Sequence, residues 1–148
     1  MKKMIYTSIL LLTTTVPILT SCTLLSNKSS IKTHTYDEVI DYHISFKNLL
    51  KMEDFEYFAY IYSPRCLHCE SIKYQVIEYA LDDYKPMYFI VFDETIPLIY
   101  DISISLNQNT LSNVGILGTP AMILVVNGYV KINISGGDVI LSLLDAYK

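Results

Sequence analysis

The chain has 148 residues, of which 51% are hydrophobic and 18% are charged, and its formal net charge is -4. This length suits one domain, and the composition excludes a disordered or collagen-like polymer. The acidic balance, without a basic run, argues against a nucleic-acid partner. Three cysteines are too few for a disulfide-stapled miniprotein, so the question is which of their thiols are free.

The N-terminal segment has the pattern of a secretory signal. Lys2 and Lys3 form a charged region, an apolar stretch up to Leu19 follows, and small residues precede Cys22. The apolar stretch is too short for a spanning helix of about 20 residues. Leu-Thr-Ser-Cys at its end resembles the bacterial lipobox, which implies cleavage before Cys22 and a lipid on its thiol. The alternative is a plain signal peptide with an incidental cysteine.

We therefore expect three parts, a lipoprotein signal peptide at 1–21, a lipidated tether at 22–35 and a folded domain at 36–148. The tether is polar and has little apolar periodicity, which is typical of a flexible linker. The acyl chains on Cys22 alone would hold the mature chain at the bacterial membrane, facing outside the cytoplasm, because no polybasic patch supplements them.

The folded domain is expected to begin with a helix and a strand. Residues 35–38 have the form of a capping box, and apolar residues follow at helical spacing up to Leu50. Residues 57–62 form a short apolar run that stops before Ser63 and Pro64, which predicts a buried strand.

A second helix is predicted from Cys66, with apolar residues on one face, and it should end near Lys85 and Pro86. Residues 87–92 form a second apolar strand. For residues 93–114 the pattern leaves two alternatives open, helical turns or a further strand.

The C-terminal third carries a hairpin signal, in which two apolar runs at 121–126 and 129–134 flank Asn127 and Gly128. An amphipathic helix is expected after Gly136. The two strands joined through the Cys66 helix should be parallel, and the hairpin should add antiparallel strands. The fold class is therefore α/β, a central mixed sheet flanked by helices.

The chemistry is expected at the Cys-Leu-His-Cys segment, residues 66–69. Two cysteines three positions apart at a helix start can bring their sulfurs within bonding distance. Free amide groups and the helix dipole favour a thiolate at Cys66, and His68 and Arg65 would add positive charge as tuning residues. A stabilised thiolate makes the disulfide easier to reduce.

These residues resemble the thioredoxin family. The cysteine pair follows a predicted strand, residues 114–120 are similar to the segment before the family's cis-proline, and the hairpin follows directly. The resemblance covers 36–148 and implies a thioredoxin-like fold. It also implies that Cys66 is the nucleophile, that Cys69 resolves the mixed disulfide, and that Thr119 and Pro120 bind the client segment.

The resemblance further implies an enzyme without cofactor or metal, whose partners are extracytoplasmic proteins with cysteines and a protein that recycles its redox state. The direction of electron flow stays open. His68 stands where disulfide-forming oxidases have histidine, but Leu67 stands where they usually have proline. Tyr60 stands where many thioredoxins have a buried acid, and tyrosine, with a pKa of about 10, is a poor base at neutral pH.

Other interpretations of the pair are a static structural disulfide or a metal site. Cys66, His68 and Cys69 offer three ligands, but a structural zinc site usually needs a fourth. The alternative function is therefore a non-catalytic thioredoxin-like lipoprotein that binds a partner or a soft metal through the same cysteines.

Overall fold

The computed structural model describes residues 33–148. The predicted signal peptide, most of the predicted tether and the lipidation residue Cys22 lie outside the described residues. Within 33–148, none of the helices combines the length and the apolar character that crossing a bilayer requires.

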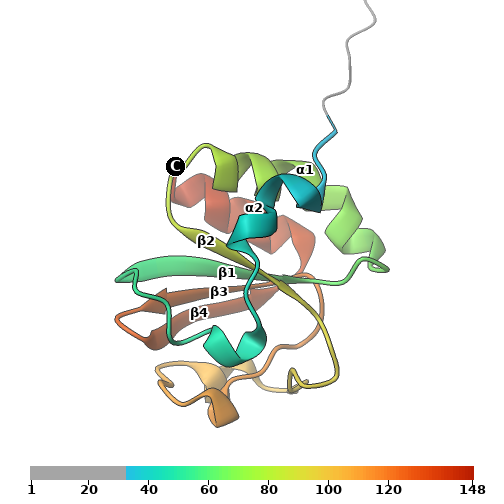
Figure 1. The fold of residues 1–148 in the computed structure, drawn as a ribbon. Coiled ribbons are helices and arrows are strands. Elements are labelled where there is room, and N and C mark those ends of the chain that lie inside the picture. Colours follow the sequence, from blue (N-terminus) through green and yellow to red (C-terminus); the bar gives the residue numbers. More distant parts are fainter. Residues whose placement is uncertain (1–32) are drawn as a thin grey trace, which may run out of the picture. The chain divides into compact units, whose positions relative to one another are not determined.

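A four-stranded mixed sheet forms the centre of the domain, in the order β2-β1-β3-β4 (Figure 1). Its strands are β1 (Glu56–Tyr62), β2 (Met87–Val91), β3 (Ala121–Val126) and β4 (Tyr129–Ser135). β1 pairs with β2 in parallel and with β3 antiparallel, and β4 completes the hairpin. The predicted strands, their directions and the mixed sheet are confirmed. Hydrophobic, mostly β-branched or aromatic runs suit these positions because both faces of the sheet are covered.

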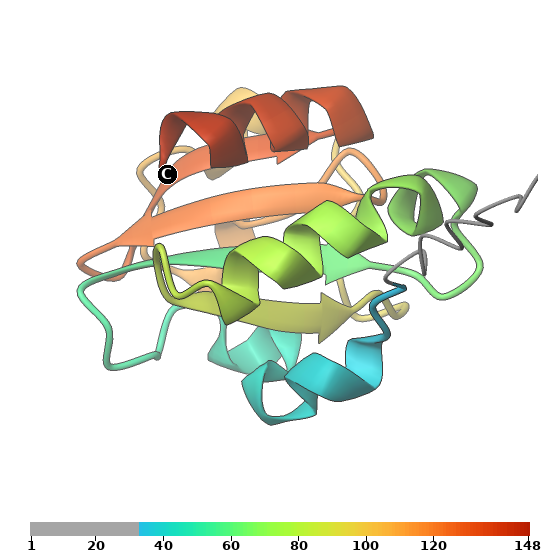
Figure 2. The same cartoon turned by 90° about the horizontal axis from the view of Figure 1, so that it is seen from above.

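Two α-helices cover one face of the sheet, α1 (Leu67–Leu81) and α2 (Gly137–Ala146), and they lie side by side on it (Figure 2). The apolar cluster between these helices and the sheet contains Phe58, Tyr60, Cys69 and Val76. A second cluster fills the opposite face, where residues 44–52 and 92–114 contribute turns and short 3-10 helices instead of α-helices. Alternate residues of β1 therefore point into different cores. Tyr60 belongs to the cluster under the two α-helices, and Tyr57 belongs to the cluster on the opposite face.

The prediction of one continuous helix after the capping box is wrong. The chain instead forms two 3-10 helices, η1 (Tyr36–Tyr42) and η2 (Phe46–Asn48), and Val39 already departs from helical dihedral angles. Between them, His43 pairs with Phe89 at the edge of β2, and the Ile44 N–H donates to the Phe89 carbonyl at 2.9 Å. Hydrogen bonds to the open edge of the sheet thus replace those that would have continued a helix.

The end of α1 differs from the prediction, and the structure decides the segment that the sequence left open. α1 ends at Leu81, not near Lys85, and Asp83 adopts a left-handed conformation with φ 56°, which stops helical pairing. The undecided segment 93–114 contains two short 3-10 helices, η3 (Ile102–Ser105) and η4 (Leu111–Asn113). An isolated parallel bridge between Leu98 and Ile116 is its only strand-like pairing.

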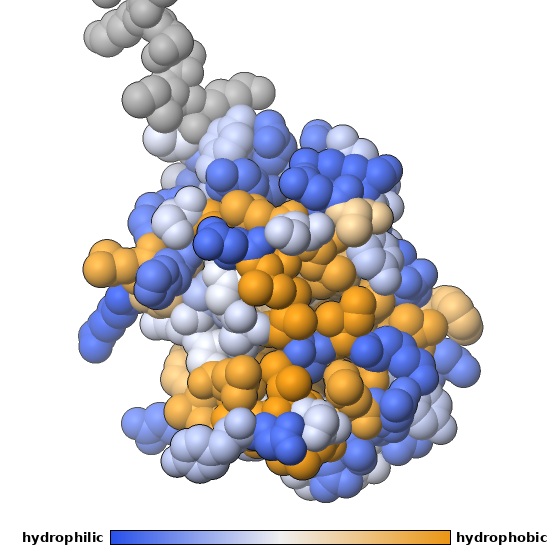
Figure 3. Space-filling view, turned by 180° about the vertical axis from the view of Figure 1, so that it is seen from behind, coloured by the Kyte–Doolittle hydropathy of each residue, from blue (hydrophilic) through white to orange (hydrophobic). Residues whose placement is uncertain are grey.

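Apolar side chains also reach the surface. The space-filling view in Figure 3 shows a broad apolar area on one face with hydrophilic borders. Among the large apolar residues, Tyr100 is fully exposed and Leu67, next to Cys66, is 85% exposed.

Candidate active site

The cysteine pair lies where β1 passes into α1. β1 ends at Tyr62, a short turn follows, and the Cys66 N–H donates to the Ser63 carbonyl at 3.0 Å. Cys66 is the N-cap of α1, with φ -90° and ψ 115°, and its sulfur accepts the hydrogen bond that an N-cap side chain takes from the first turn. The sulfur is therefore held at the positive end of a fifteen-residue helix.

The two sulfurs have unlike environments. Cys66 Sγ is half-buried, accepts a hydrogen bond from the Cys69 N–H at 3.2 Å and donates to the Thr119 carbonyl oxygen at 3.3 Å. The Cys69 side chain lies behind it in the core, 1% exposed. Both thiols are free, so the structure represents the reduced pair.

Because of these environments, the two thiols have different pKa values. Partial burial raises the pKa of Cys66, but hydrogen bonds from the Cys69 thiol, from the Thr119 side chain and from the backbone N–H groups of Cys69 and His68 outweigh it. The pKa of Cys66 is therefore below its ordinary value. Burial, followed by the hydrogen bond with Cys66, raises the pKa of Cys69 to about 11. As the pH rises, the first thiolate of the pair therefore forms at Cys66, while Cys69 stays a thiol.

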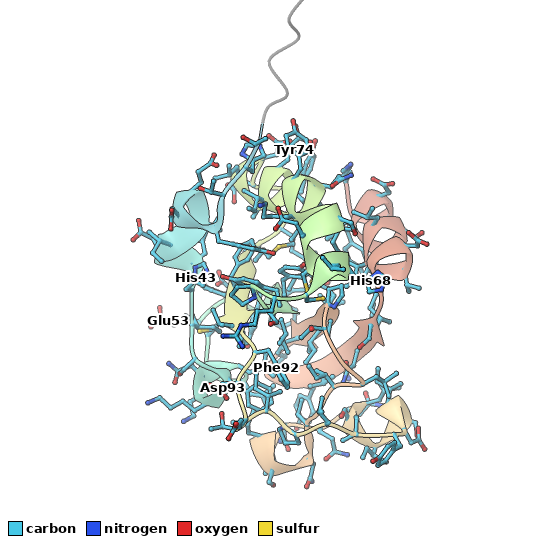
Figure 4. The ribbon with its side chains drawn as sticks, turned by 90° about the vertical axis from the view of Figure 1, so that its right-hand side faces the viewer. His43, Glu53, His68, Tyr74, Phe92 and Asp93 are labelled. Atoms are coloured by element: carbon cyan, nitrogen blue, oxygen red, sulfur yellow. The ribbon has the colours of Figure 1, made fainter. Side chains whose placement is uncertain are left out.

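The predicted tuning residues Arg65 and His68 are both exposed. His68 contributes to the acidity of Cys66 through its backbone N–H, a contribution that any residue except proline would make at this position. His68 and His43 lie on opposite sides of the beginning of α1 (Figure 4). No hydrogen bond joins the described side chains of Arg65 or His68 to the Cys66 sulfur, so their electrostatic tuning stays a prediction.

The predicted client-binding residues come together with the cysteines. Thr119 and Pro120 are joined by a cis peptide bond just before β3, and they line an open groove of about 320 Å³ with His68, Ser71 and the start of α2. The Thr119 carbonyl is the group that meets Cys66 Sγ. The structure therefore places a residue of this groove, Thr119, in direct contact with the Cys66 sulfur.

Two buried polar residues that position this segment were missed at the sequence level. Asn133 Nδ2 donates to the Gly115 carbonyl at 2.7 Å, and Ser105 Oγ accepts from the Gly115 N–H at 3.1 Å. Both side chains are almost fully buried. The signal for Asn133 was its place as an amide between Ile132 and Ile134 inside a predicted strand, since a buried amide needs a fixed partner.

The interpretation of the cysteine pair as a metal site was also compared with the structure. Within residues 33–148, no group of three or more His, Cys, Asp or Glu side chains is arranged to hold a metal ion. A metal on this pair would have to be bound by the two sulfurs and ligands from elsewhere.

Comparison with known proteins identifies the fold. No protein-family model and no curated protein matches the sequence. Among solved structures, a protein described provisionally as an oxidoreductase with a thioredoxin fold matches over its whole length and 78% of this chain, with 19% identity and a TM-score of 0.52. Mitochondrial thioredoxin 3 from Saccharomyces cerevisiae matches over 92% of its length and 70% of this chain, with 14% identity and a TM-score of 0.49. The first match and the strand order show that the chain has a thioredoxin-like fold.

Proposed function

We propose that this chain is a thiol-disulfide oxidoreductase, tethered to the bacterial membrane outside the cytoplasm, that exchanges disulfides with cysteines of other proteins. The observation that carries the proposal is the difference between the two sulfurs. Cys66 is half-buried with a lowered pKa, whereas Cys69 is buried directly behind it with a raised pKa. The first sulfur can reach a client, and the second is placed to react with the first.

In the reducing direction, the Cys66 thiolate attacks a client disulfide, and one client sulfur leaves as a thiolate that takes up a proton. Cys69 then loses its proton and attacks Cys66 Sγ, which breaks the mixed disulfide and releases the second client sulfur. Two electrons pass to the client, and the pair becomes a disulfide. Oxidation of a dithiol client is the reverse. Either direction requires a redox partner that restores the pair.

Thr119 and Pro120 are proposed to bind the client segment that carries the cysteine. They line the groove beside Cys66, and the Thr119 carbonyl, now occupied by the thiol, becomes a free acceptor once Cys66 is bonded to the client. The side chain of Leu67, the residue after Cys66, is exposed and offers an apolar contact. These features favour an extended protein segment over a small thiol.

The test is a trapping experiment with matched serine variants. Cys69→Ser should accumulate mixed disulfides with client proteins, because Cys66 can still attack but nothing releases it. Cys66→Ser is the control and should accumulate none. Absence of trapped clients in cells, together with failure to reduce insulin or to oxidise a reduced client, would contradict the function. A soft metal bound in stoichiometric amount and lost on Cys69→Ser would instead favour the binding protein.

The membrane location rests on the lipobox-like sequence before Cys22. We expect mass spectrometry of the mature protein to find an N-terminal cysteine with attached acyl chains. Cys22→Ser should abolish attachment of the acyl chains, so that the protein is found either in the soluble fraction or as an uncleaved precursor. The substitution should not change disulfide exchange by the purified domain. An unmodified Cys22 in the mature protein would contradict lipid anchoring and leave the exchange chemistry to be judged separately.

A further inference from the structure

The groove beside the cysteine pair lies between the beginnings of the two α-helices, which are side by side on the sheet (Figure 2). Three segments line it, the first turns of α1 (His68 and Ser71), the turn before β3 (Thr119 and Pro120) and the start of α2 (residues 136–139). The carbonyl of one lining residue, Thr119, is 3.3 Å from Cys66 Sγ. A protein segment that reacts at Cys66 can therefore place a neighbouring side chain in this groove.

Two glycines at the start of α2 leave this part of the groove without side chains. The Gly136 N–H donates to the Pro120 carbonyl at 2.9 Å, and its φ of 109° favours glycine. A Cβ atom on Gly137 would lie 3.0 Å from Ile72 Cγ2, so glycine lets α2 begin close to α1. A Cβ atom on Gly136 would meet no atom within 4 Å, which shows that the space beside it is open. The backbone of the two glycines therefore sets the shape of the groove here.

The lining combines apolar, hydroxyl and anionic groups. Val139 is 52% exposed and offers an apolar surface. The Ser71 hydroxyl donates to the His68 carbonyl at 2.9 Å, so its oxygen can still accept a hydrogen bond. The Asp138 side chain is exposed, and among residues 33–148 no basic side chain lies within ion-pair distance of its carboxylate. The groove thus contains an unpaired negative charge beside an apolar surface.

Asp138 dominates the charge of the groove. The N-terminus of a helix carries a partial positive charge of about half an elementary charge, whereas Asp138, in the first turn of α2, carries a full negative charge. Within residues 33–148, His68 is the only other titratable side chain that lines the groove. The formal net charge of the chain, -4, also favours the approach of a cation.

We propose that this groove binds a lysine or arginine side chain that lies close to the reacting cysteine in the client. The inference rests on the proposed function and names the class of client segment that reacts fastest. Lysine and arginine pack their aliphatic stems on apolar surface and keep the charged end in a polar environment. In the groove the stem would contact Val139, and the charged end would meet Asp138 and the Ser71 oxygen. An aliphatic side chain would leave Asp138 unpaired, and an acidic one would be repelled by it.

The size of the preference follows from the exposure of the carboxylate. Ion pairs between exposed side chains change an equilibrium by about two- to fivefold. A client with lysine should therefore react with Cys66 about two- to fivefold faster than the same client with an uncharged side chain. Salt screens exposed charges, so this preference should decrease as the ionic strength rises.

The test measures the reaction of Cys66 with peptides that carry one cysteine in a mixed disulfide with thionitrobenzoate. Lysine, norleucine or glutamate is placed in turn at the two positions before and the two positions after that cysteine. Norleucine has an aliphatic stem without the charge. The protein is the full chain carrying Cys22→Ser and Cys69→Ser, so Cys66 supplies its only thiol. The Cys66 thiolate attacks the peptide sulfur, and thionitrobenzoate leaves as a coloured thiolate that stopped flow detects.

At the position that reaches the groove, lysine should react about two- to fivefold faster than norleucine, and glutamate should react slower. Asp138→Asn should make the rates with lysine and norleucine equal, and Asp138→Lys should make the glutamate peptide the fastest. Asp145→Asn is the matched control, because it removes the same charge near the opposite end of α2, where Asp145 pairs with Lys148. It should keep the preference for lysine.

Three outcomes would overturn the inference alone. They are equal rates for lysine and norleucine at all four positions, a preference for lysine that survives Asp138→Asn, and loss of the preference in Asp145→Asn, which would assign it to net charge. If Cys66 reacted with every peptide no faster than free cysteine does, the proposed function would fail as well.

Discussion

The sulfur of Cys66 lies 3.3 Å from the carbonyl oxygen of Thr119, which follows it 53 positions later in the chain. The contact exists because β1 ends and β3 begins at the same end of the sheet, where Ile61 pairs with Ala121. The start of α1 and the turn before β3 therefore form a single site. Changes in either segment should be detectable at the sulfur of Cys66.

Alkylation should distinguish the two thiols by their pH dependence. Because the pKa of Cys66 is lowered in the folded protein, its thiolate persists as the pH falls below the ordinary cysteine pKa of about 8.5. We expect iodoacetamide to modify Cys66 faster than an unfolded thiol at neutral pH and to leave Cys69 unmodified, as measured by mass spectrometry. The same chain in denaturant is the control. Equal rates in the folded and unfolded states would contradict the assignment.

The reduction potential of the Cys66-Cys69 couple should decide the direction of exchange, between about -270 mV for a reductant such as thioredoxin and about -120 mV for an oxidant such as DsbA. The hydrogen bonds to the Cys66 thiolate stabilise the reduced form, and this makes the disulfide a stronger oxidant. Equilibration with glutathione measures the potential. His68→Ala should lower it by at most about 30 mV, because the backbone N–H remains and only the imidazole is lost. A larger fall of the potential in His68→Ala would contradict this expectation.

Gly115→Ala should destabilise the segment that carries Thr119. A Cβ atom at this position would lie 2.6 Å from Ile99 Cγ2 and 2.7 Å from the Pro97 carbonyl oxygen, and the backbone oxygen cannot move away freely. We expect a loss of about 1–3 kcal/mol in the free energy of unfolding, measured by urea denaturation, and slower alkylation of Cys66.

The exposed Ser112 lies in the same segment and offers a matched control. Ser112→Ala should change neither the free energy of unfolding nor the reactivity of Cys66. If Gly115→Ala is as stable as the parent chain, the packing of this segment against residues 97–99 is not as described.

Two tyrosines of β1 should respond differently to the same substitution. Tyr57 Oη donates to the Leu49 carbonyl at 2.5 Å, so Tyr57→Phe removes a partner from a buried acceptor and should cost about 1–2 kcal/mol. Tyr60→Phe removes a buried hydroxyl without a normal hydrogen bond and should change the free energy of unfolding by less than about 0.5 kcal/mol, or increase it. Urea denaturation of the reduced proteins at neutral pH compares them. Equal costs would contradict the different environments of the two hydroxyls.

Local patterns were sufficient for most of the elements. The strand at 57–62, the helix after Cys66 and the hairpin around Asn127 and Gly128 are confirmed, because apolar periodicity and turn residues act over a few neighbouring positions. The helix expected over 36–50 failed for a nonlocal reason. His43 and Ile44 pair with β2, and the free edge of a strand more than forty residues later is not visible in the local pattern.

The sequence by itself determined the fold class and the two cysteines of the candidate site, because alternation, helix periodicity and the Cys-Leu-His-Cys spacing are properties of short segments. Only the tertiary structure decided which groups surround the two sulfurs. The Thr119 carbonyl reaches Cys66, and Cys69 becomes buried between α1 and the sheet, only after the sheet has assembled. The acidities of the two thiols differ because burial and hydrogen bonds from distant segments act on each sulfur separately.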